Sequence, residues 1–385
     1  MLTSPELSQR HLEWTGRAAR VFRAPGRVNL VGEHTDYAGG FCMPAALHFS
    51  TLAAASARED PRLVVHSVDL DETVAYDLAP MPERGSGKWA DYVAGVARQL
   101  MAKGIRLTGA DVTLTGDVPR NAGLSSSASL EVAAAFALLG TSGGEMDGRE
   151  IALLCQRAEN NFVGAPCGIM DQFVSVYGKA GDALVFDCRS LDYEYVTLPV
   201  HLRLVIANSM VKHSVAGGEY RERRGQVEEG TRLLAEIYPG VRLLRDVSLE
   251  QLEAARTVLP EVIYRRCRHV ISDSGRVLAG RDMLRSGNVA GFGRMLVEAH
   301  ASYRDDFAAS CAECDTLVEL AVGLPGCYGS RLTGGGFGGC TVSVVEADKA
   351  ESFRDALREK YLAATGISAD SWVCEIGDGA REIVV

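Results

Sequence analysis

The sequence lacks several features that would place it in other classes of protein. No apolar run approaches the ~18 residues of a membrane-spanning helix. The first residues, MLTSPELSQRHLEW, have neither the apolar centre nor the cleavage site of a secretory signal. Internal repeats and low-complexity linkers are also missing. The net charge of -10 argues against nucleic acid or an anionic membrane as the main partner, so we expect neither.

The sequence contains ten cysteines but no pattern of disulfides or zinc ligands. Most of them lie inside apolar segments, where cysteine acts as a small hydrophobic residue in a reducing compartment. Cys311 and Cys314 form a C-x-x-C pair, but no second pair follows at zinc-ribbon spacing. We interpret this pair as incidental helix spacing and expect a cytoplasmic protein.

The 385 residues are enough for two or three domains with a large core. The patterns predict strands at 50–60, 63–69, 110–119, 183–188, 202–209, 340–346 and 372–377. They predict helices at 89–104, 129–140, 149–164, 224–238, 249–257, 270–284, 289–303 and 314–323. Strands and helices are mixed without the regular alternation of a doubly wound sheet. We therefore expect an α+β protein of two lobes, residues 1–200 and 201–385.

The stretch GRVNLVGEHTDYAGG, which begins at Gly26, concentrates hydrogen-bonding side chains beside an apolar run. Alternation along a strand places Val28 and Leu30 on one side and Arg27 and Asn29 on the other. Gly32 then ends the strand, and the polar residues that follow it lie in one loop. Carboxylates bind hydroxyl groups well, and a buried polar group left unpaired is costly. The stretch therefore indicates a site for a small polyhydroxylated ligand.

A second dense stretch, GDVPRNAGLSSSASLEVAAA, ends a predicted strand at Pro119 and leads into a helix. Gly123 permits a tight turn, and small residues before a helix N-terminus let backbone N–H groups approach an anion. The Walker pattern G-x-x-x-x-G-K-[ST] is absent from the chain. A serine-rich start that only caps its own helix is the alternative. Three consecutive serines exceed that need, so we favour a nucleotide phosphate as the ligand.

A third stretch, TGGGFGGC, matches G-x-G-x-x-G formally across Gly334 to Gly339. It leads into an alternating strand and opens no helix, so it is not a dinucleotide fingerprint. Two interpretations stay open, a tight hairpin or a loop whose backbone approaches a ligand closely.

Two acids stand out because local partners are missing. Glu159 has no basic residue three or four positions away on its predicted helix, which suggests either a metal ligand or an ordinary exposed glutamate. Asp171 follows the apolar segment from Cys167 to Met170. It is either a helix cap or a carboxylate that orients a hydroxyl nucleophile and accepts its proton.

The segments APGRVNLVGEHTDYAGG, GLSSSASLEVA, PCGIMDQF and RLTGGGFGGCTVSVV resemble the motifs of the GHMP small-molecule kinases in their galactokinase form. The resemblance runs from Arg23 to the C-terminal GDGAREIVV. It implies a mixed-sheet N-terminal lobe and a ferredoxin-like C-terminal lobe, with the active site in the cleft between them. It also implies ATP-dependent phosphorylation of the C1 hydroxyl of D-galactose to galactose 1-phosphate, the first committed step of galactose catabolism by the Leloir pathway. The expected partners are galactose and ATP, with Mg²⁺ as the cofactor and a monomer as the assembly.

The same resemblance assigns roles to individual residues. Asp171 and Arg27 are the expected catalytic pair, because a cation keeps the carboxylate ionised and helps hold the reacting groups. Ser127 and Glu159 are the expected Mg²⁺ ligands. The expected sugar-binding residues are Glu33, His34, Thr35, Asp36, Gly168, Asp171 and Tyr220. The expected ATP-binding residues are Trp89, Gly123, Leu124, Ser125, Ser126, Ser127, Ala128, Gly335 and Gly336, with an ordinary core aromatic as the alternative for Trp89.

The sequence departs from the family pattern at Asn121, where the second motif usually has glycine. Asparagine is the next best residue for a left-handed backbone, so we expect the loop to be kept and nucleotide affinity to be the property affected. Two rivals share these motifs: a kinase for N-acetylgalactosamine or arabinose, and a sugar sensor that has lost catalysis. The sensor predicts a missing base or a broken phosphate loop, and neither is seen here.

Overall fold

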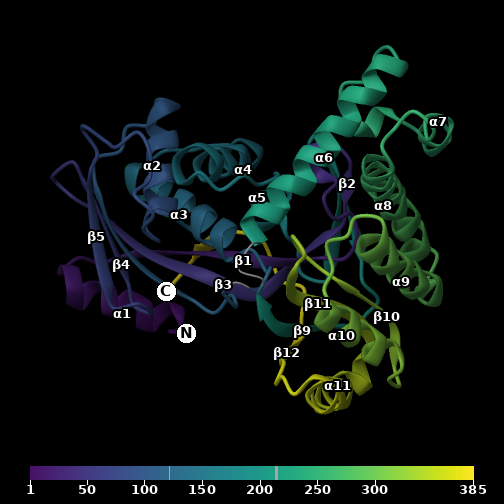
Figure 1. Ribbon diagram of the computed structural model, residues 1–385. Coiled ribbons are helices and arrows are strands. Elements are labelled where there is room, and N and C mark those ends of the chain that lie inside the picture. The colour runs from purple at the N-terminus through teal and green to yellow at the C-terminus, as the bar shows by residue number, and fades with distance from the viewer. Residues whose placement is uncertain (121, 213–215) are drawn as a thin grey trace.

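Three β-sheets form the framework of the protein, and this computed structural model describes residues 1–120, 122–212 and 216–385. Two of the sheets belong to two lobes that lie side by side in Figure 1. The architecture is α+β with two lobes, as the sequence predicts. Asn121, whose influence on the nucleotide loop is a sequence-based prediction, lies outside the described residues.

A six-stranded sheet and its covering helices make up the N-terminal lobe. Its elements are α1 (Ser4–Thr15), β1 (Arg20–Asn29), β3 (Pro44–Ala57), β4 (Arg62–Ser67), β5 (Glu72–Asp77), α2 (Asp91–Ala102), β6 (Ala110–Gly116), α3 (Ser126–Ser142), α4 (Gly148–Arg157), α5 (Met170–Tyr177) and β13 (Arg381–Ile383). The strand order is β13-β1-β3-β6-β4-β5, and the sheet is mixed because β4 and β6 run parallel while the other neighbours are antiparallel.

Side-chain alternation decides which helices cover each face of this sheet. Val21 and Leu52 point to one face, where they pack with Leu7 of α1. Phe22 and Ala53, one residue further along their strands, point to the other face and pack with α2 and α3. Figure 1 shows this division, with α1 on one side of the sheet and α2 to α5 on the other.

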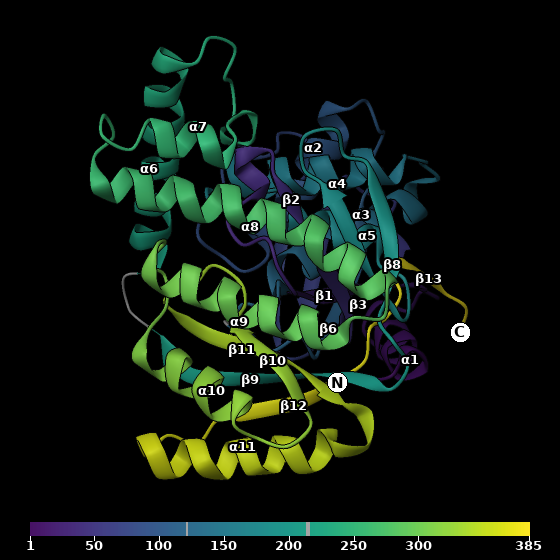
Figure 2. The same ribbon diagram turned by 90° about the vertical axis from the view of Figure 1, so that its right-hand side faces the viewer.

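A four-stranded antiparallel sheet organises the C-terminal lobe, in the order β10-β11-β9-β12. Its elements are β9 (Leu202–Lys212), α6 (Ala216–Ile237), α7 (Leu249–Ala254), α8 (Glu261–Arg285), α9 (Val289–Asp305), α10 (Ala312–Val322), β10 (Cys327–Leu332), β11 (Gly338–Glu346), α11 (Ala350–Thr365) and β12 (Asp370–Cys374). Val205 and Ala207 of β9 face α10 and α11, which gives the α/β sandwich seen in Figure 2. A small third sheet joins β2 (Phe41–Cys42), β7 (Asp182–Asp187) and β8 (Tyr193–Thr197).

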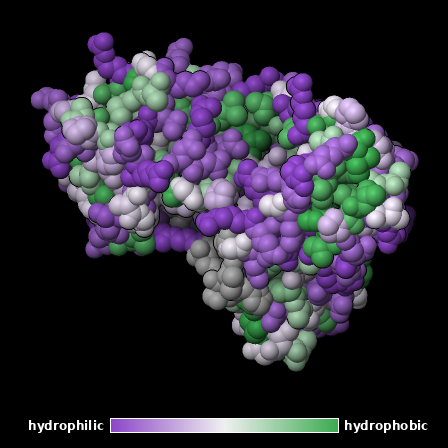
Figure 3. Space-filling model, turned by 45° about the horizontal axis from the view of Figure 1, so that its top comes forward, coloured by the Kyte–Doolittle hydropathy of each residue, from purple (hydrophilic) through white to green (hydrophobic). Residues whose placement is uncertain are grey.

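Most of the molecular face drawn in Figure 3 is hydrophilic, and hydrophobic residues are visible mainly in a recess near the centre and on the right-hand lobe. Across the described residues, no helix combines the length and the apolar character needed to cross a membrane. All ten cysteines lie within the described residues and are free thiols.

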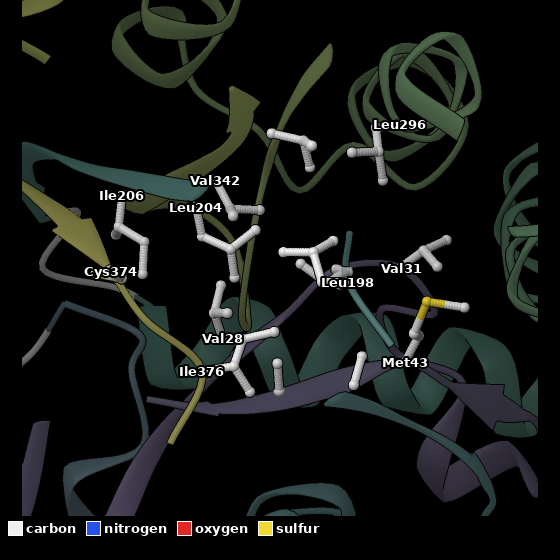
Figure 4. Packing of buried hydrophobic residues seen from close by; sticks show 14 of the residues in the cluster. Val28, Val31, Met43, Leu198, Leu204, Ile206, Leu296, Val342, Cys374 and Ile376 are labelled. Atoms are coloured by element: carbon white, nitrogen blue, oxygen red, sulfur yellow. The ribbon is translucent and has the colours of Figure 1, made fainter. Parts of the chain in front are cut away.

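The two lobes share one apolar core. Figure 4 shows Val28 from the N-terminal lobe close to Leu204 from the C-terminal sheet, and the same cluster includes Met43, Ile206 and Val342. These side chains are fully buried in a single cluster. The C-terminal tail adds a second connection, since β13 returns to pair with β1. The lobe boundary near residue 200 stays a prediction. Strand β13, close to the C-terminus, belongs to the six-stranded sheet of the N-terminal lobe.

Several elements differ from the sequence-based expectation: helix α11 was not predicted, and α8 begins at Glu261 instead of residue 270. Helix α1 was not predicted, although Thr3 and Glu6 form a capping box in which the backbone N of Thr3 donates to Glu6 Oε2 at 2.7 Å. The helix predicted at 149–164 is regular only to Arg157. A π-helical turn, Ala158–Val163, follows it and carries Glu159. Such turns are frequent at functional sites.

Candidate active site

Three loops meet where the lobes join, and they carry the three sequence motifs. We name them the polar loop (residues 32–40), the serine loop (residues 122–128) and the glycine loop (residues 334–339). Asp171, at the start of α5, lies between the first two.

The polar loop leaves β1 through a glycine that the backbone requires. Gly32 has a φ of +92°, and a Cβ at this position would lie 2.6 Å from the carbonyl oxygen of Phe41. The Thr35 hydroxyl lies 2.9 Å and 2.7 Å from the carbonyl oxygens of Gly32 and Phe41. Thr35 therefore braces the loop from inside, and its role as a sugar contact stays a prediction.

Glu33 and His34 connect the polar loop to the glycine loop. Glu33 Oε1 accepts a hydrogen bond of 2.9 Å from the backbone N of Gly334. Nε2 of His34 lies 3.3 Å from the carbonyl oxygen of Gly335, and Nδ1 lies 2.9 Å from the Tyr37 hydroxyl. Burial lowers the pKa of His34 to about 4, so the ring is neutral at pH 7. Because a carbonyl only accepts, we assign the proton to Nε2.

Asp36 is packed against the backbone of Gly168. A Cβ at Gly168 would lie 1.6 Å from Asp36 Oδ2, so only glycine permits this approach. The Tyr220 ring lies beside the same loop, with its centre 5.0 Å from that of His34. Burial, and then the negative charge of Asp171, raise the pKa of Asp36 to about 6. The structure thus brings the predicted sugar-binding residues of three segments together.

Arg27 and Asp171 form a bidentate ion pair. Nε of Arg27 donates to Oδ1 at 2.8 Å and Nη2 donates to Oδ2 at 3.0 Å. Arg27 is 5% exposed, whereas the Asp171 side chain is 27% exposed, so the carboxylate faces open space while its partner is buried. Charge-assisted bidentate pairs of this kind fix the carboxylate plane as well as its charge. The predicted catalytic pair is therefore in direct contact.

The serine loop contacts the same carboxylate. Ser125 has a φ of +62°, which is unusual for a residue other than glycine, and its hydroxyl donates to Asp171 Oδ2. The carbonyl oxygen of Leu124 accepts from the backbone N of Arg27 at 3.0 Å. Strained backbone of this kind is concentrated at active sites. Ser125 was predicted to bind the nucleotide, and its contact with Asp171 was not predicted.

A cavity of about 240 Å³ opens beside the start of α3. It is lined by apolar and polar side chains together, which suits a flat heterocyclic base next to phosphate. Trp89, Ser126 and Ser127, all predicted ATP-binding residues, line it, and Tyr92 and Asp69 line it as well. Trp89 is thus beside a cavity, and its indole N–H donates to Glu72 Oε2 at 2.9 Å.

Glu159 projects from the π-helical turn toward the serine loop, and its carboxylate is buried. Burial raises the pKa of Glu159, and hydrogen bonds from Cys167 and the Ser127 hydroxyl oppose this rise. Gln172 Nε2 donates to Glu159 Oε2 at 2.7 Å and to Glu131 Oε2 at 3.0 Å. The predicted metal ligands Ser127 and Glu159 are therefore adjacent.

These oxygen donors fit Mg²⁺, which is usually held by one or two carboxylates together with substrate phosphates. Glu131 Oε1 and Gln172 Oε1 are buried without a hydrogen-bond partner, so the region has unused acceptor capacity. Among the described residues, no cluster of three or more His, Cys, Asp and Glu side chains forms a complete metal cage. A metal here would therefore depend on ligand phosphates.

The glycine loop lies against the other two loops. A Cβ at Gly334 would lie 3.1 Å from the carbonyl oxygen of Gly123, and a Cβ at Gly336 would lie 2.4 Å from the carbonyl oxygen of Ala309. The loop connects the antiparallel neighbours β10 and β11, so it is the turn of a hairpin, and its backbone also approaches other backbone closely. A close approach to a ligand stays a prediction. Gly335 and Gly336 do not line the cavity beside Trp89, and their contact with ATP stays a prediction.

Sequence reasoning missed several residues of the site. Glu131 lies four positions after Ser127, and this spacing on one helix face was a usable signal. Gln172 directly follows Asp171 but has no distinguishing pattern. Asp273 and Arg331, which contact the start of the polar loop, come from distant parts of the chain and gave no signal.

Comparisons with known proteins agree with this arrangement. The model of the galactokinase galactose-binding signature matches residues 9–57. The GHMP kinases N terminal domain matches residues 91–179, and the GHMP kinases C terminal model matches residues 281–363. These segments contain the polar loop, the serine loop with Asp171, and the glycine loop.

Individual relatives cover nearly the whole chain. A galactokinase of Roseiflexus sp. (strain RS-1) is 45% identical over 385 residues, which are 100% of this chain and 98% of the relative. A galactokinase of Chloroflexus aggregans (strain MD-66 / DSM 9485) is 45% identical over 360 residues, 94% of this chain and 92% of the relative. The crystal structure of Lactococcus lactis galactokinase complexed with galactose has a TM-score of 0.93 and 31% identity, and covers 98% of this chain and 99% of that one. The mevalonate kinase of Methanococcus jannaschii, with a TM-score of 0.65 and 16% identity over 94% of this chain and 99% of that one, shares the fold.

Proposed function

The chain belongs to the galactokinase family of GHMP kinases, and on this premise we propose that it transfers the γ-phosphoryl group of ATP to the C1 hydroxyl of D-galactose. The products are galactose 1-phosphate and ADP. The observation that carries the proposal is the bidentate contact of Arg27 with Asp171 between the polar loop and the serine loop.

The polar loop supplies the sugar contacts. Glu33 and Asp36 offer carboxylate oxygens, and His34 and Tyr220 offer an imidazole and a phenol in the same region. Gly168 adds backbone beside Asp36. A site built from fixed hydrogen-bonding groups rejects sugars in which a hydroxyl is missing or inverted, by up to ~10⁴-fold, because its buried groups are left unpaired. Discrimination between galactose and glucose depends on such pairing at the 4-hydroxyl.

Asp171 acts on the nucleophile. Its carboxylate orients the C1 hydroxyl and accepts the proton as the new O–P bond forms and the bond to the ADP oxygen breaks. Arg27 holds the plane of the carboxylate through its two hydrogen bonds. The Ser125 hydroxyl donates a hydrogen bond to Oδ2 of Asp171, and this contact keeps the carboxylate in one orientation. A loose phosphoryl-transfer transition state needs little help from a base, so orientation is the larger contribution.

The serine loop and the start of α3 receive the phosphates through backbone N–H groups and the helix N-terminus. Ser127 and Glu159 would hold Mg²⁺, which neutralises phosphate charge when it is bound. Trp89 and Tyr92 offer aromatic surface to the adenine in the adjoining cavity.

We also infer that the protein acts in the cytoplasm and as a monomer. Ten free thiols, including buried ones, are typical of a reducing compartment. Size-exclusion chromatography with light scattering, with and without substrates, tests the assembly, and a stable dimer would contradict it.

The deciding experiment measures ADP release with Mg-ATP and each of galactose, glucose, N-acetylgalactosamine and arabinose. We expect turnover with galactose and a kcat/KM for glucose lower by at least about 100-fold. ³¹P NMR of the product identifies a phosphate on the anomeric carbon. Equal rates for glucose and galactose would contradict the specificity, and the absence of turnover with all four sugars would contradict the function.

A further inference from the structure

A buried ion pair of the C-terminal lobe reaches into the N-terminal lobe. Asp273 of α8 and Arg331 of β10 are each 0% exposed, which is rare for charged residues. Asp273 Oδ2 accepts two hydrogen bonds of 2.9 Å, from the backbone N of Gly32 and from that of Glu33. Nη1 of Arg331 donates to the carbonyl oxygen of Leu30 at 3.2 Å. All three bonds end on the backbone where β1 becomes the polar loop.

The charge of Asp273 is balanced inside the C-terminal lobe. Arg331 Nη1 lies 3.8 Å from Asp273 Oδ2, and Arg276 Nη1 lies 3.3 Å from Oδ1. Burial by itself would raise the pKa of Asp273, but Arg331, His269 and Arg276 outweigh it and lower the pKa below its ordinary value. The group that holds the polar loop is thus a carboxylate ion, and its hydrogen bonds to the N–H groups are charge-assisted.

The backbone held in this way is strained. Gly32 has a φ of +92° and His34 a φ of +59°, so two of three consecutive residues lie in the left-handed region. For histidine this conformation is uncommon. Strained backbone persists only where the surrounding structure over-determines it. The two N–H groups bound by Asp273 are those of Gly32 and Glu33, which lie directly before His34.

We propose that Asp273 and Arg331 are positioning residues of the sugar site, which hold the backbone of residues 30–33 so that Glu33 and His34 meet the sugar. The proposal rests on the proposed function and deepens it. Neither side chain takes part in the sugar contacts, yet galactose affinity depends on both. Nucleotide affinity does not depend on these two residues, because the residues that line the cavity beside Trp89 all belong to the N-terminal lobe.

A buried ion pair can also serve stability alone, and the chain offers a matched control for that role. Asp111 of β6 is 2% exposed and pairs with Arg17 at 2.6 Å and Arg58 at 2.7 Å. It contacts neither the polar loop nor the serine loop in the hydrogen bonds of the described chain. Asp273→Asn and Asp111→Asn both keep the size of the side chain and remove one buried charge beside two arginines.

The test compares wild type, D273N and D111N by calorimetric titration with galactose in the absence of nucleotide, by steady-state kinetics and by thermal unfolding. We expect D273N to raise the Kd and KM for galactose by roughly tenfold to a hundredfold, since hydrogen bonds to a charged group are weakened. The KM for ATP should stay within about twofold. D111N should lower the Tm and leave the galactose Kd unchanged. A wild-type galactose Kd in D273N, whatever its Tm, overturns the proposal.

A second variant covers the case in which D273N does not fold, and the wild type separates the positioning role from the proposed function. If D273N does not give folded protein, R331K replaces it in the same measurements. Lysine keeps the charge but lacks the planar guanidinium, so we expect a weaker galactose affinity, and an unchanged one overturns the proposal. Failure of the wild type to bind galactose both with and without a non-hydrolysable ATP analogue contradicts the proposed function. Binding by the wild type with an unaltered D273N contradicts only the positioning role.

Discussion

The polar loop and the serine loop both contact Asp171 or its neighbours, yet the protein holds them in different ways. Glu33, His34 and Thr35 of the polar loop are each 5% exposed or less. Glu33 and His34 contact the glycine loop, and the backbone N of Glu33 donates to Asp273 of α8 in the other lobe. The serine loop is bound mainly to Arg27 and Asp171, and its serines remain half-buried beside an open cavity.

This difference in bracing implies that the sugar and the phosphate chain are recognised in different ways. A braced, buried loop is organised before its ligand arrives, so little conformational entropy is lost on binding and a misplaced hydroxyl meets unpaired groups. An open loop at a helix N-terminus binds any phosphate chain through its backbone. We therefore expect sugar selectivity to be strict and changes around the nucleotide to be tolerated. Changes at Asp171, Gly168, Asp36 and Trp89 should therefore affect the two loops to different extents.

Replacing Asp171 with asparagine should have the largest effect, because both loops converge on this carboxylate. We expect kcat to fall by about 10³-fold, within the range typical of acid–base and orienting groups. Galactose affinity should change little, since the polar loop is braced without Asp171. Stopped-flow ADP release and calorimetric titration measure the two quantities. Full turnover in D171N would remove Asp171 from the chemistry.

Gly168→Ala should act on sugar binding alone. The added Cβ would lie 1.6 Å from Asp36 Oδ2, so the aspartate must leave its position. We expect the KM for galactose to rise roughly 100-fold, which corresponds to about 3 kcal/mol, while the KM for ATP stays the same. Gly164→Ala, where no atom lies within 4 Å of the added Cβ, is the nearby control, although its φ of +82° carries a backbone cost. An equal loss of ATP affinity in G168A would mean that the two loops are not independent.

The pH dependence of kcat/KM for galactose should reflect the raised pKa of Asp36, which is buried in the polar loop. Burial, and then the charge of Asp171, raise the pKa of Asp36 to about 6 from an ordinary value of 3.8. If the ionised Asp36 carboxylate accepts hydrogen bonds from the sugar hydroxyls, kcat/KM for galactose falls up to tenfold per pH unit below about pH 6. The stability contribution has the opposite sign. The folded state binds this proton more tightly, so stability rises as pH falls from about 6 toward about 4.

A pH series of kcat/KM for wild type and Asp36→Asn checks this account. The variant should have a lower activity at neutral pH and should lose the acidic limb. Retention of that limb would assign it to another group, of which Glu33, whose pKa is also raised by burial, is the first candidate.

Trp89→Ala should have the smallest effect, because the nucleotide cavity is open. Loss of one aromatic surface is worth about 1 kcal/mol, so we expect the KM for ATP to rise about fivefold. The KM for galactose should be unaltered. Isothermal titration with a non-hydrolysable ATP analogue measures the change directly. An unchanged ATP affinity would make Trp89 an ordinary packing residue, which was the alternative interpretation of the sequence.

Much of this site could be predicted because its chemistry lies in short segments. The helix at α2 and the strands β4, β6 and β11 follow patterns of period 3.6 or 2, and the structure has them where the patterns predict. The motif around Asp171 suggested a carboxylate beside a hydroxyl, and Arg27 could be paired with it only through the family resemblance. The π-helical turn at Glu159 has no periodicity of its own, so the sequence predicted a regular helix there.

The types of side chain in each loop, the positions of the glycines and the flanking elements depend on neighbouring residues, so they can be predicted from the order of amino acids. The contacts of Asp273 and Arg331 with the backbone of residues 30–33, the contact of Ser125 with Asp171 and the bridge of Gln172 between two glutamates became visible only in the folded chain. A hydrogen bond between segments depends on distance in space. Burial then sets its strength by removing water, and neither quantity is written in the order of residues along the chain.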